Sequence, residues 1–155
     1  MRDPVGEWQQ QGSIYLWRFK PEKRGLTGWH FAGDDQGCAS TVALVRLLIH
    51  LDYPAKRTLR LAPPSCKIAR IPFAYEGAHR LVCPTALRLR SCHDQLPSAW
   101  GVTEDADHVE FALGREALKE LLAGIESLRQ GDWDFSVGPH EGGRAQNVWM
   151  WSAVA

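Results

Sequence analysis

The spacing of apolar residues along the chain predicts two long helices. Between 36 and 51, apolar side chains fall on two adjoining helical faces, and only the Arg46 and His50 stripe is polar. Between 115 and 130, leucine or isoleucine recurs at helical spacing, opposite a charged face, and Gly131 follows as a stop signal. We therefore expect one largely buried helix and one helix with a solvent-exposed side.

A period of two predicts a hairpin near the N-terminus. Residues 14–19 alternate so that Tyr15, Trp17 and Phe19 share one face of a strand. Residues 27–32 form the next β-like segment. We expect these two strands to pair antiparallel.

A second hairpin is predicted near the C-terminus, where residues 132–137 and 147–151 flank a glycine-rich loop. On the last strand, Trp149 and Trp151 share one face. An exposed tryptophan pair would form a stacking surface for a sugar, base or peptide, whereas a covered pair would belong to the core. The chain has seven tryptophans, several times the usual share, so whether such rings are exposed or buried bears directly on function.

The remaining β-like segments decide the fold class. They occupy 56–61, 67–74, 79–83, 85–90, 100–107 and 108–113. Many strands with few helical crossovers predict an α+β fold with a mainly antiparallel, twisted sheet of about six to eight strands. The helices at about 36–51 and 115–130 would cover this sheet, and residues 1–155 would form a single domain without an internal repeat.

Composition and charge narrow the classes of function. The chain has 155 residues, 45% of them apolar and 23% charged, which is a globular composition. Its 18 basic and 18 acidic residues cancel, which argues against nucleic acid or a membrane surface as partner. Without a signal-peptide core, an apolar run of membrane-spanning length or paired cysteine spacings, the sequence predicts a cytoplasmic protein with free thiols.

The stretch GDDQGCAS at 33–40 raises the question of an active site, because it places Cys38 near the start of the first helix. Backbone N–H groups there favour a thiolate, and Gln36 could donate to an oxyanion. In the competing interpretation, Asp35 caps the helix and Cys38 is a small buried residue. Asp34 and Asp35 also oppose thiolate formation by their charge, which favours the cap.

Neither a metal nor a cofactor is predicted. Four candidate ligands are close in sequence: His79, Cys83, Cys92 and His93. They lack the paired short spacings of structural zinc sites, and adjacent residues of a strand point to opposite sides.

Charge is segregated along the chain. Residues 56–90 hold eight Lys or Arg against one acid, whereas residues 101–134 hold nine acids against three bases. Arg57 and Arg60 lie in the basic segment, which could bind an acidic partner or single-stranded nucleic acid. Alternatively, basic strands pair with acidic strands inside the fold or between copies.

The leading hypothesis is a non-enzymatic binding or protein-interaction module that engages a protein partner or its own copy. Trp149, Trp151, Arg57 and Arg60 are its candidate binding residues. The alternative is a cysteine-dependent hydrolase or transferase, with Cys38 as nucleophile, Gln36 as oxyanion donor and a histidine as base. The histidine would come from His79, His93, His108 or His140.

Overall fold

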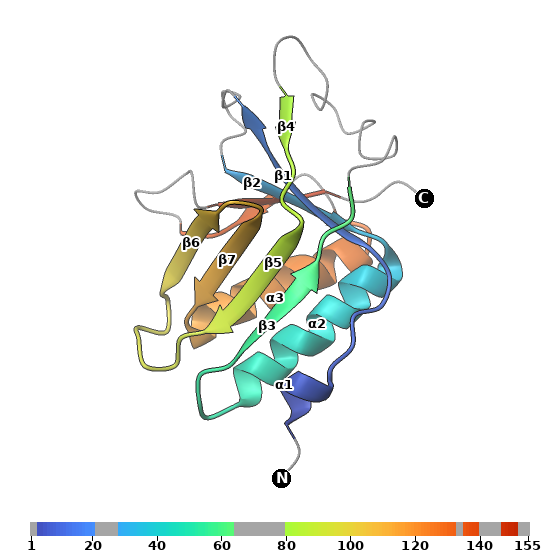
Figure 1. Cartoon of the computed structure of the whole chain (residues 1–155). Coiled ribbons are helices and arrows are strands. Elements are labelled where there is room, and N and C mark those ends of the chain that lie inside the picture. The colour runs from blue at the N-terminus through green and yellow to red at the C-terminus, as the bar shows by residue number, and fades with distance from the viewer. Residues whose placement is uncertain (1–2, 21–27, 64–79, 133–134, 140–146, 152–155) are drawn as a thin grey trace.

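Two β-sheets, two long helices and one short helix make up the described fold in a computed structural model of the chain (Figure 1). The structure describes residues 3–20, 28–63, 80–132, 135–139 and 147–151. The helices are α1 (Pro4–Glu7), α2 (Asp35–His50) and α3 (Arg115–Arg129). The strands are β1 (Ile14–Lys20), β2 (Trp29–Gly33), β3 (Lys56–Arg60), β4 (Arg80–Val82), β5 (Ala86–Ser91), β6 (Trp100–Asp105), β7 (His108–Leu113), β8 (Phe135–Val137) and β9 (Val148–Met150).

The α+β class and both long helices are confirmed, but the prediction of a single sheet is wrong. A five-stranded sheet has the order β4-β1-β2-β9-β8, and a four-stranded sheet has the order β3-β5-β7-β6. Both predicted terminal hairpins pair antiparallel, β1 with β2 and β8 with β9. Each sheet also contains one parallel pair, β2 with β9 and β5 with β7, so both sheets are mixed. The segment predicted at 67–74 lies outside the described residues.

The two halves of the chain have the same topology. In each half an antiparallel hairpin (β1–β2 or β6–β7) leads into a long helix (α2 or α3), and two further strands follow (β3 and β5, or β8 and β9). These last two strands join the sheet of the other half, so that β9 lies parallel to β2 and β5 lies parallel to β7. Only β4 lacks a counterpart among the described strands. The sequence gives almost no sign of this repeat.

Corresponding core positions of the two helices are 80 residues apart. Cys38, Val45 and Leu48 of α2 correspond to Leu118, Ile125 and Leu128 of α3, and all six are buried. The helices lie side by side behind the four-stranded sheet, while the five-stranded sheet crosses above them (Figure 1). The inner faces of both sheets close on these helices in one hydrophobic core. A buried leucine or isoleucine contributes roughly 1.5–3 kcal/mol by leaving water.

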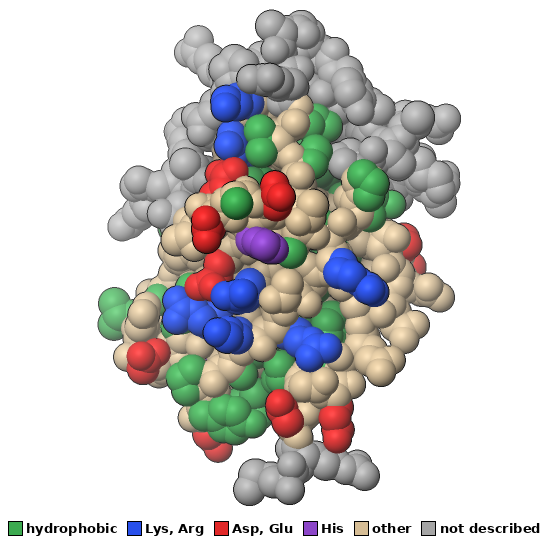
Figure 2. Space-filling view, in the orientation of Figure 1, with side chains coloured by type: hydrophobic (Ala, Val, Ile, Leu, Met, Phe, Trp, Pro, Cys, Tyr) green, Lys and Arg blue, Asp and Glu red, His purple; other side chains and the backbone are tan. Residues whose placement is uncertain are grey.

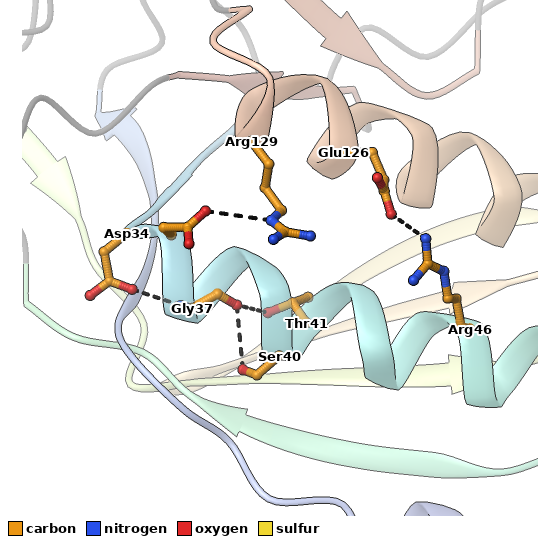
Figure 3. Close-up of polar contacts among 8 residues, drawn as sticks. Asp34, Gly37, Ser40, Thr41, Arg46, Glu126 and Arg129 are labelled. Atoms are coloured by element: carbon orange, nitrogen blue, oxygen red, sulfur yellow. Dashed lines mark hydrogen bonds and ion pairs between the residues drawn. The ribbon is translucent and has the colours of Figure 1, made fainter.

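Polar contacts between corresponding residues hold the halves together. Arg46 of α2 pairs with Glu126, its own counterpart on α3 (Figure 3). Likewise Arg18 on β1 donates two hydrogen bonds of 3.2 Å to the carboxylate of Glu104, its counterpart on β6. Opposite charges at such positions favour pairing of one half with the other over pairing of two identical halves. No helix within the described residues is long and apolar enough to span a membrane.

Candidate functional site

The outer face of each sheet, turned away from the helices, is where the two halves differ most. On the five-stranded sheet this face is aromatic. His30 lies at its centre, stacked on Trp17 with 5.5 Å between ring centroids and 6.1 Å from Trp151. Phe19 meets the same imidazole edge to face at 5.0 Å. We call these residues, together with Trp149, the aromatic cluster.

The aromatic cluster is packed rather than open. The indole N–H of Trp151 donates to Nδ1 of His30 at 2.9 Å, so Nδ1 carries a lone pair and the imidazole is neutral. His30 is 1% exposed and Trp151 is 4% exposed, while Trp149 is partly exposed. The predicted shared face of Trp149 and Trp151 is present, and burial at Trp151 favours a core role over a free stacking surface.

The outer face of the four-stranded sheet is polar and open to solvent. It carries Lys56, Thr58 and Arg60 from β3, Arg88 and Arg90 from β5, His108 and Glu110 from β7, and Thr103 and Asp105 from β6. Figure 2 shows basic side chains gathered over this sheet, with acidic ones beside them. We call the four cations, Lys56, Arg60, Arg88 and Arg90, the basic face.

One carboxylate partly neutralises the basic face. Glu110 accepts a hydrogen bond of 2.9 Å from Arg90 and lies 3.6 Å from a guanidinium nitrogen of Arg88. Basic and acidic strands of the same fold therefore do pair here. Lys56 and Arg60 have no carboxylate partner among the described residues. Their charges remain available to a ligand.

A hollow of about 460 Å³ lies beside these charges on the same face. Its polar lining comes from all four strands: Thr58, Arg88, Thr103, Asp105, His108 and Glu110. This is the place where an extended ligand could meet both charge and hydrogen-bonding groups.

Arg57 does not belong to the basic face, because it points to the opposite side of β3 from Lys56 and Thr58. Its guanidinium donates to the carbonyl oxygens of Gly6 and Trp8 at 3.3 and 3.0 Å and lies over the Trp8 ring. Arg57 therefore anchors the N-terminal segment to β3. Of the four binding candidates, only Arg60 lies on an open charged surface.

The GDDQGCAS segment forms the start of α2, and Asp34 rather than Asp35 is its N-cap. The Asp34 carboxylate accepts from the N–H of Gly37 at 2.6 Å and from the N–H of Ser13 at 3.0 Å. Asp35 is the first helical residue and pairs instead with Arg129 of α3 at 3.5 Å. The prediction that Asp35 caps the helix is therefore wrong by one residue, because the Asp34 carboxylate is the one that reaches the Gly37 N–H.

The glycines of this segment allow a close approach of the chain before β1. A Cβ atom on Gly37 would lie 2.2 Å from the carbonyl oxygen of Ser13. Gly12 opposes it with a φ of +67°, and a Cβ there would lie 2.3 Å from the Gly37 nitrogen. Ser40 continues this contact, because its hydroxyl donates to the carbonyl of Gln11 at 3.0 Å. The motif thus docks the N-terminal segment on α2.

Cys38 is shielded by the same packing. Its thiol is 2% exposed, and a Cβ on Gly33 would lie 3.0 Å from its sulfur. Burial, reinforced by the charges of Asp34 and Asp35 and only partly offset by Arg129, raises the pKa of Cys38 to about 11. The protonated thiol therefore predominates near neutral pH, which is unfavourable for a nucleophile. Gln36 is exposed on the first turn.

The described histidines do not form a metal site. Nε2 of His93 lies 3.1 Å from the carbonyl oxygen of Leu48, and His108 lines the hollow on the four-stranded sheet. No group of three or more His, Cys, Asp or Glu side chains suited to a metal occurs within the part of the chain that the structure describes. His79 and His140 lie outside it.

Comparison with protein-family models, curated proteins and solved structures finds no match to this chain.

Proposed function

We propose that this protein is a non-enzymatic interaction module that binds an acidic, extended segment of a partner protein on the basic face. One observation carries the proposal: four cations on the neighbouring strands β3 and β5 face solvent with Glu110 as the only carboxylate paired to them among the described residues. Lys56 and Arg60 are the primary contacts, and Arg88 contributes from the wall of the hollow.

The spacing on β3 fits an extended ligand. Lys56, Thr58 and Arg60 alternate with inward-facing residues and so stand about 6.6–6.8 Å apart along the strand. An extended peptide has the same repeat, so carboxylates four residues apart can meet Lys56 and Arg60, with a hydrogen-bonding residue between them over Thr58.

Two other occupants fit less well. Single-stranded nucleic acid is held by stacking of bases on aromatic rings, and the described residues of this face include no aromatic ring apart from the His108 imidazole. In a symmetric contact between two copies, the cations of one basic face would meet the cations of the other, and their like charges would repel. An acidic peptide segment meets no such repulsion.

Fluorescence anisotropy with a labelled peptide of alternating Glu and Ser tests the proposal. We expect saturable binding that weakens at least tenfold in the double variant Lys56→Glu, Arg60→Glu, because both unpaired cations become repulsive. Raising salt from about 50 to about 200 mM should weaken it as well, since the contacts lie at the surface.

Matched controls distinguish this surface from general charge attraction. Lys119→Glu changes an exposed cation on α3 and should leave affinity within about twofold. A labelled oligothymidine of the same net charge should bind more weakly than the peptide. Equal loss in the Lys119 variant and the double variant, or preference for the oligonucleotide, would contradict the proposal.

A further inference from the structure

Among the described strands, β6 is an edge strand whose outer side pairs with no other strand. The N–H of Gly114 donates to the carbonyl of Ala99 at 2.8 Å, which fixes the alternation of bonded pairs along β6 and β7. The bonded pairs then include Thr103 with Glu110, and the N–H and C=O groups of Val102 and Glu104 point away from β7. β6 is the last strand of its sheet, and these backbone groups have no partner among the described residues.

The other half of the molecule shows what covers the corresponding edge. β1 is the counterpart of β6, and its edge is not free: β4 pairs with it antiparallel, with Arg18 opposite Val82 and Lys20 opposite Arg80. Glu104 is the counterpart of Arg18, because Leu16 and Val102 face the corresponding residues Phe31 and Phe111. The second half has no described counterpart of β4. The corresponding part of β6, residues 104–106, is therefore paired on its outer side by none of the described strands.

From this asymmetry we infer that β6 binds an extended basic and apolar segment of another protein as an added antiparallel strand. Its backbone would bond to the outward N–H and C=O groups of Val102 and Glu104. β4 pairs slightly further along β1, at residues 18–20, whose counterparts on β6 are residues 104–106. Exposed Asp105 and nearby Asp107 make this edge acidic, which selects basic side chains in the added strand, whereas Glu104 is already paired with Arg18. If two copies paired edge to edge through β6, Glu104 and Asp105 of both chains would lie close together. Their like charges would repel, which disfavours a second copy as the added strand.

This surface is separate from the basic face and takes a ligand of opposite charge. The basic face uses side chains of β3 and β5, whereas the edge uses backbone groups on the far strand of the sheet. Either can therefore exist without the other. A protruding edge strand without a partner is also a liability for aggregation, which its carboxylates reduce in the free protein.

Amide hydrogen exchange by NMR tests the inference on the full chain. The probe is the peptide acetyl-Lys-Arg-Leu-Val-Arg-Lys-amide, built around the sequence of β4. In the free protein the amides of Val102 and Glu104 should exchange rapidly, whereas those of Thr103 and Asp105 are protected by β7. Saturating peptide should slow exchange at Val102 and Glu104 at least tenfold and leave the other two unchanged.

Three controls make the outcome specific. A peptide with proline in place of Leu and Val keeps the charge but cannot pair, so it should give no protection. Val102→Pro removes an outward N–H without removing a bond to β7, and it should abolish binding while the thermal transition persists. Asp105→Asn with Asp107→Asn should weaken binding about tenfold. Binding of both peptides alike, or protection elsewhere with none at Val102 and Glu104, would overturn the inference.

Discussion

The outer faces of the two sheets occupy the same place in the two halves, yet one is core and the other is surface. His30 on β2 corresponds to Glu110 on β7, and each is the centre of its face. Around His30 stand Trp149 and Trp151, and around Glu110 stand Arg88 and Arg90 at the corresponding positions. One topology thus supports an aromatic cluster on one side and a basic face on the other.

The position of a residue on its strand therefore fixes which side chains it meets. The residue type decides whether water is excluded from that face of the sheet. The neutral imidazole of His30 can be buried because it stacks on rings and accepts from Trp151. A carboxylate needs cations or water, so Glu110 keeps its face polar. We expect function on the face that remains open.

The largest loss of stability is expected when the central residues of the two faces are exchanged. His30→Glu places a carboxylate among tryptophans without a cation and should destabilise the protein by about 4 kcal/mol or prevent folding. Glu110→His should cost less than about 1 kcal/mol, because its ion pairs are partly exposed. Urea unfolding measures both. If the two variants lost similar free energies of unfolding, the contrast between a buried aromatic face and an open polar face would be wrong.

The helix starts provide a second comparison, because Gly37 of α2 corresponds to Ala117 of α3. Gly37→Ala makes the two helices alike at this position, but the new methyl group meets the backbone of Ser13 at 2.2 Å. We expect a loss of about 3 kcal/mol by urea unfolding, since a backbone contact cannot relax as a flexible side chain can. A stable Gly37→Ala protein would mean that residues 12–13 are not docked on α2.

In alkaline solution, Cys38 should make the free energy of unfolding depend on pH, whereas its counterpart Leu118 cannot ionise. A thiol whose pKa is raised to about 11 keeps its proton in the folded protein while the unfolded thiol ionises from about 9 upward. The stability that the protonated Cys38 thiol contributes below pH 9 is therefore lost as pH rises from 9 to 11, by up to about 3 kcal/mol. Urea unfolding across this range should show the loss in the wild type and a correspondingly smaller slope in Cys38→Ala.

Iodoacetamide provides a second readout of the same burial. Near neutral pH, exposed Cys83 should be labelled and Cys38 should not, although burial also raises the pKa of Cys83. Rapid labelling of Cys38 in the native protein would revive the cysteine-dependent alternative.

The smallest effect is expected in the turn between β6 and β7. Ala106 has a φ of +51°, a conformation that suits glycine. Ala106→Gly should therefore stabilise the protein by a few tenths to about 1 kcal/mol, which a rise in the thermal midpoint would report. An unchanged or lower midpoint would show that this turn is not strained.

The helices and hairpins were predictable because their signals are local. Apolar spacing located α2 and α3 within a residue at each end, and the period of two placed Tyr15 with Trp17 and Trp149 with Trp151. The parallel pairs β2–β9 and β5–β7 were not predictable, because they join strands from opposite halves and no local pattern encodes that contact.

Function was harder to predict because alternation does not reveal which face is covered. Trp149 and Trp151 obey the same alternation as Arg88 and Arg90, and only the arrangement of the sheets shows how they differ in exposure. Arg57 was a reasonable candidate by its charge, but the N-terminal segment folds back onto it. Glu110 was missed as the centre of a site, although it lies in an acidic segment opposite a basic one.

Chemical-shift mapping with the alternating Glu and Ser peptide tests the central claim most directly, because it reports both outer faces in one experiment. If the peptide binds on the basic face, the largest chemical-shift changes should occur at Lys56, Thr58, Arg60 and Arg88. The indole N–H signals of Trp17 and Trp151 should not change. Shifts concentrated at those indoles, with β3 and β5 silent, would contradict this prediction and move the binding site to the aromatic cluster.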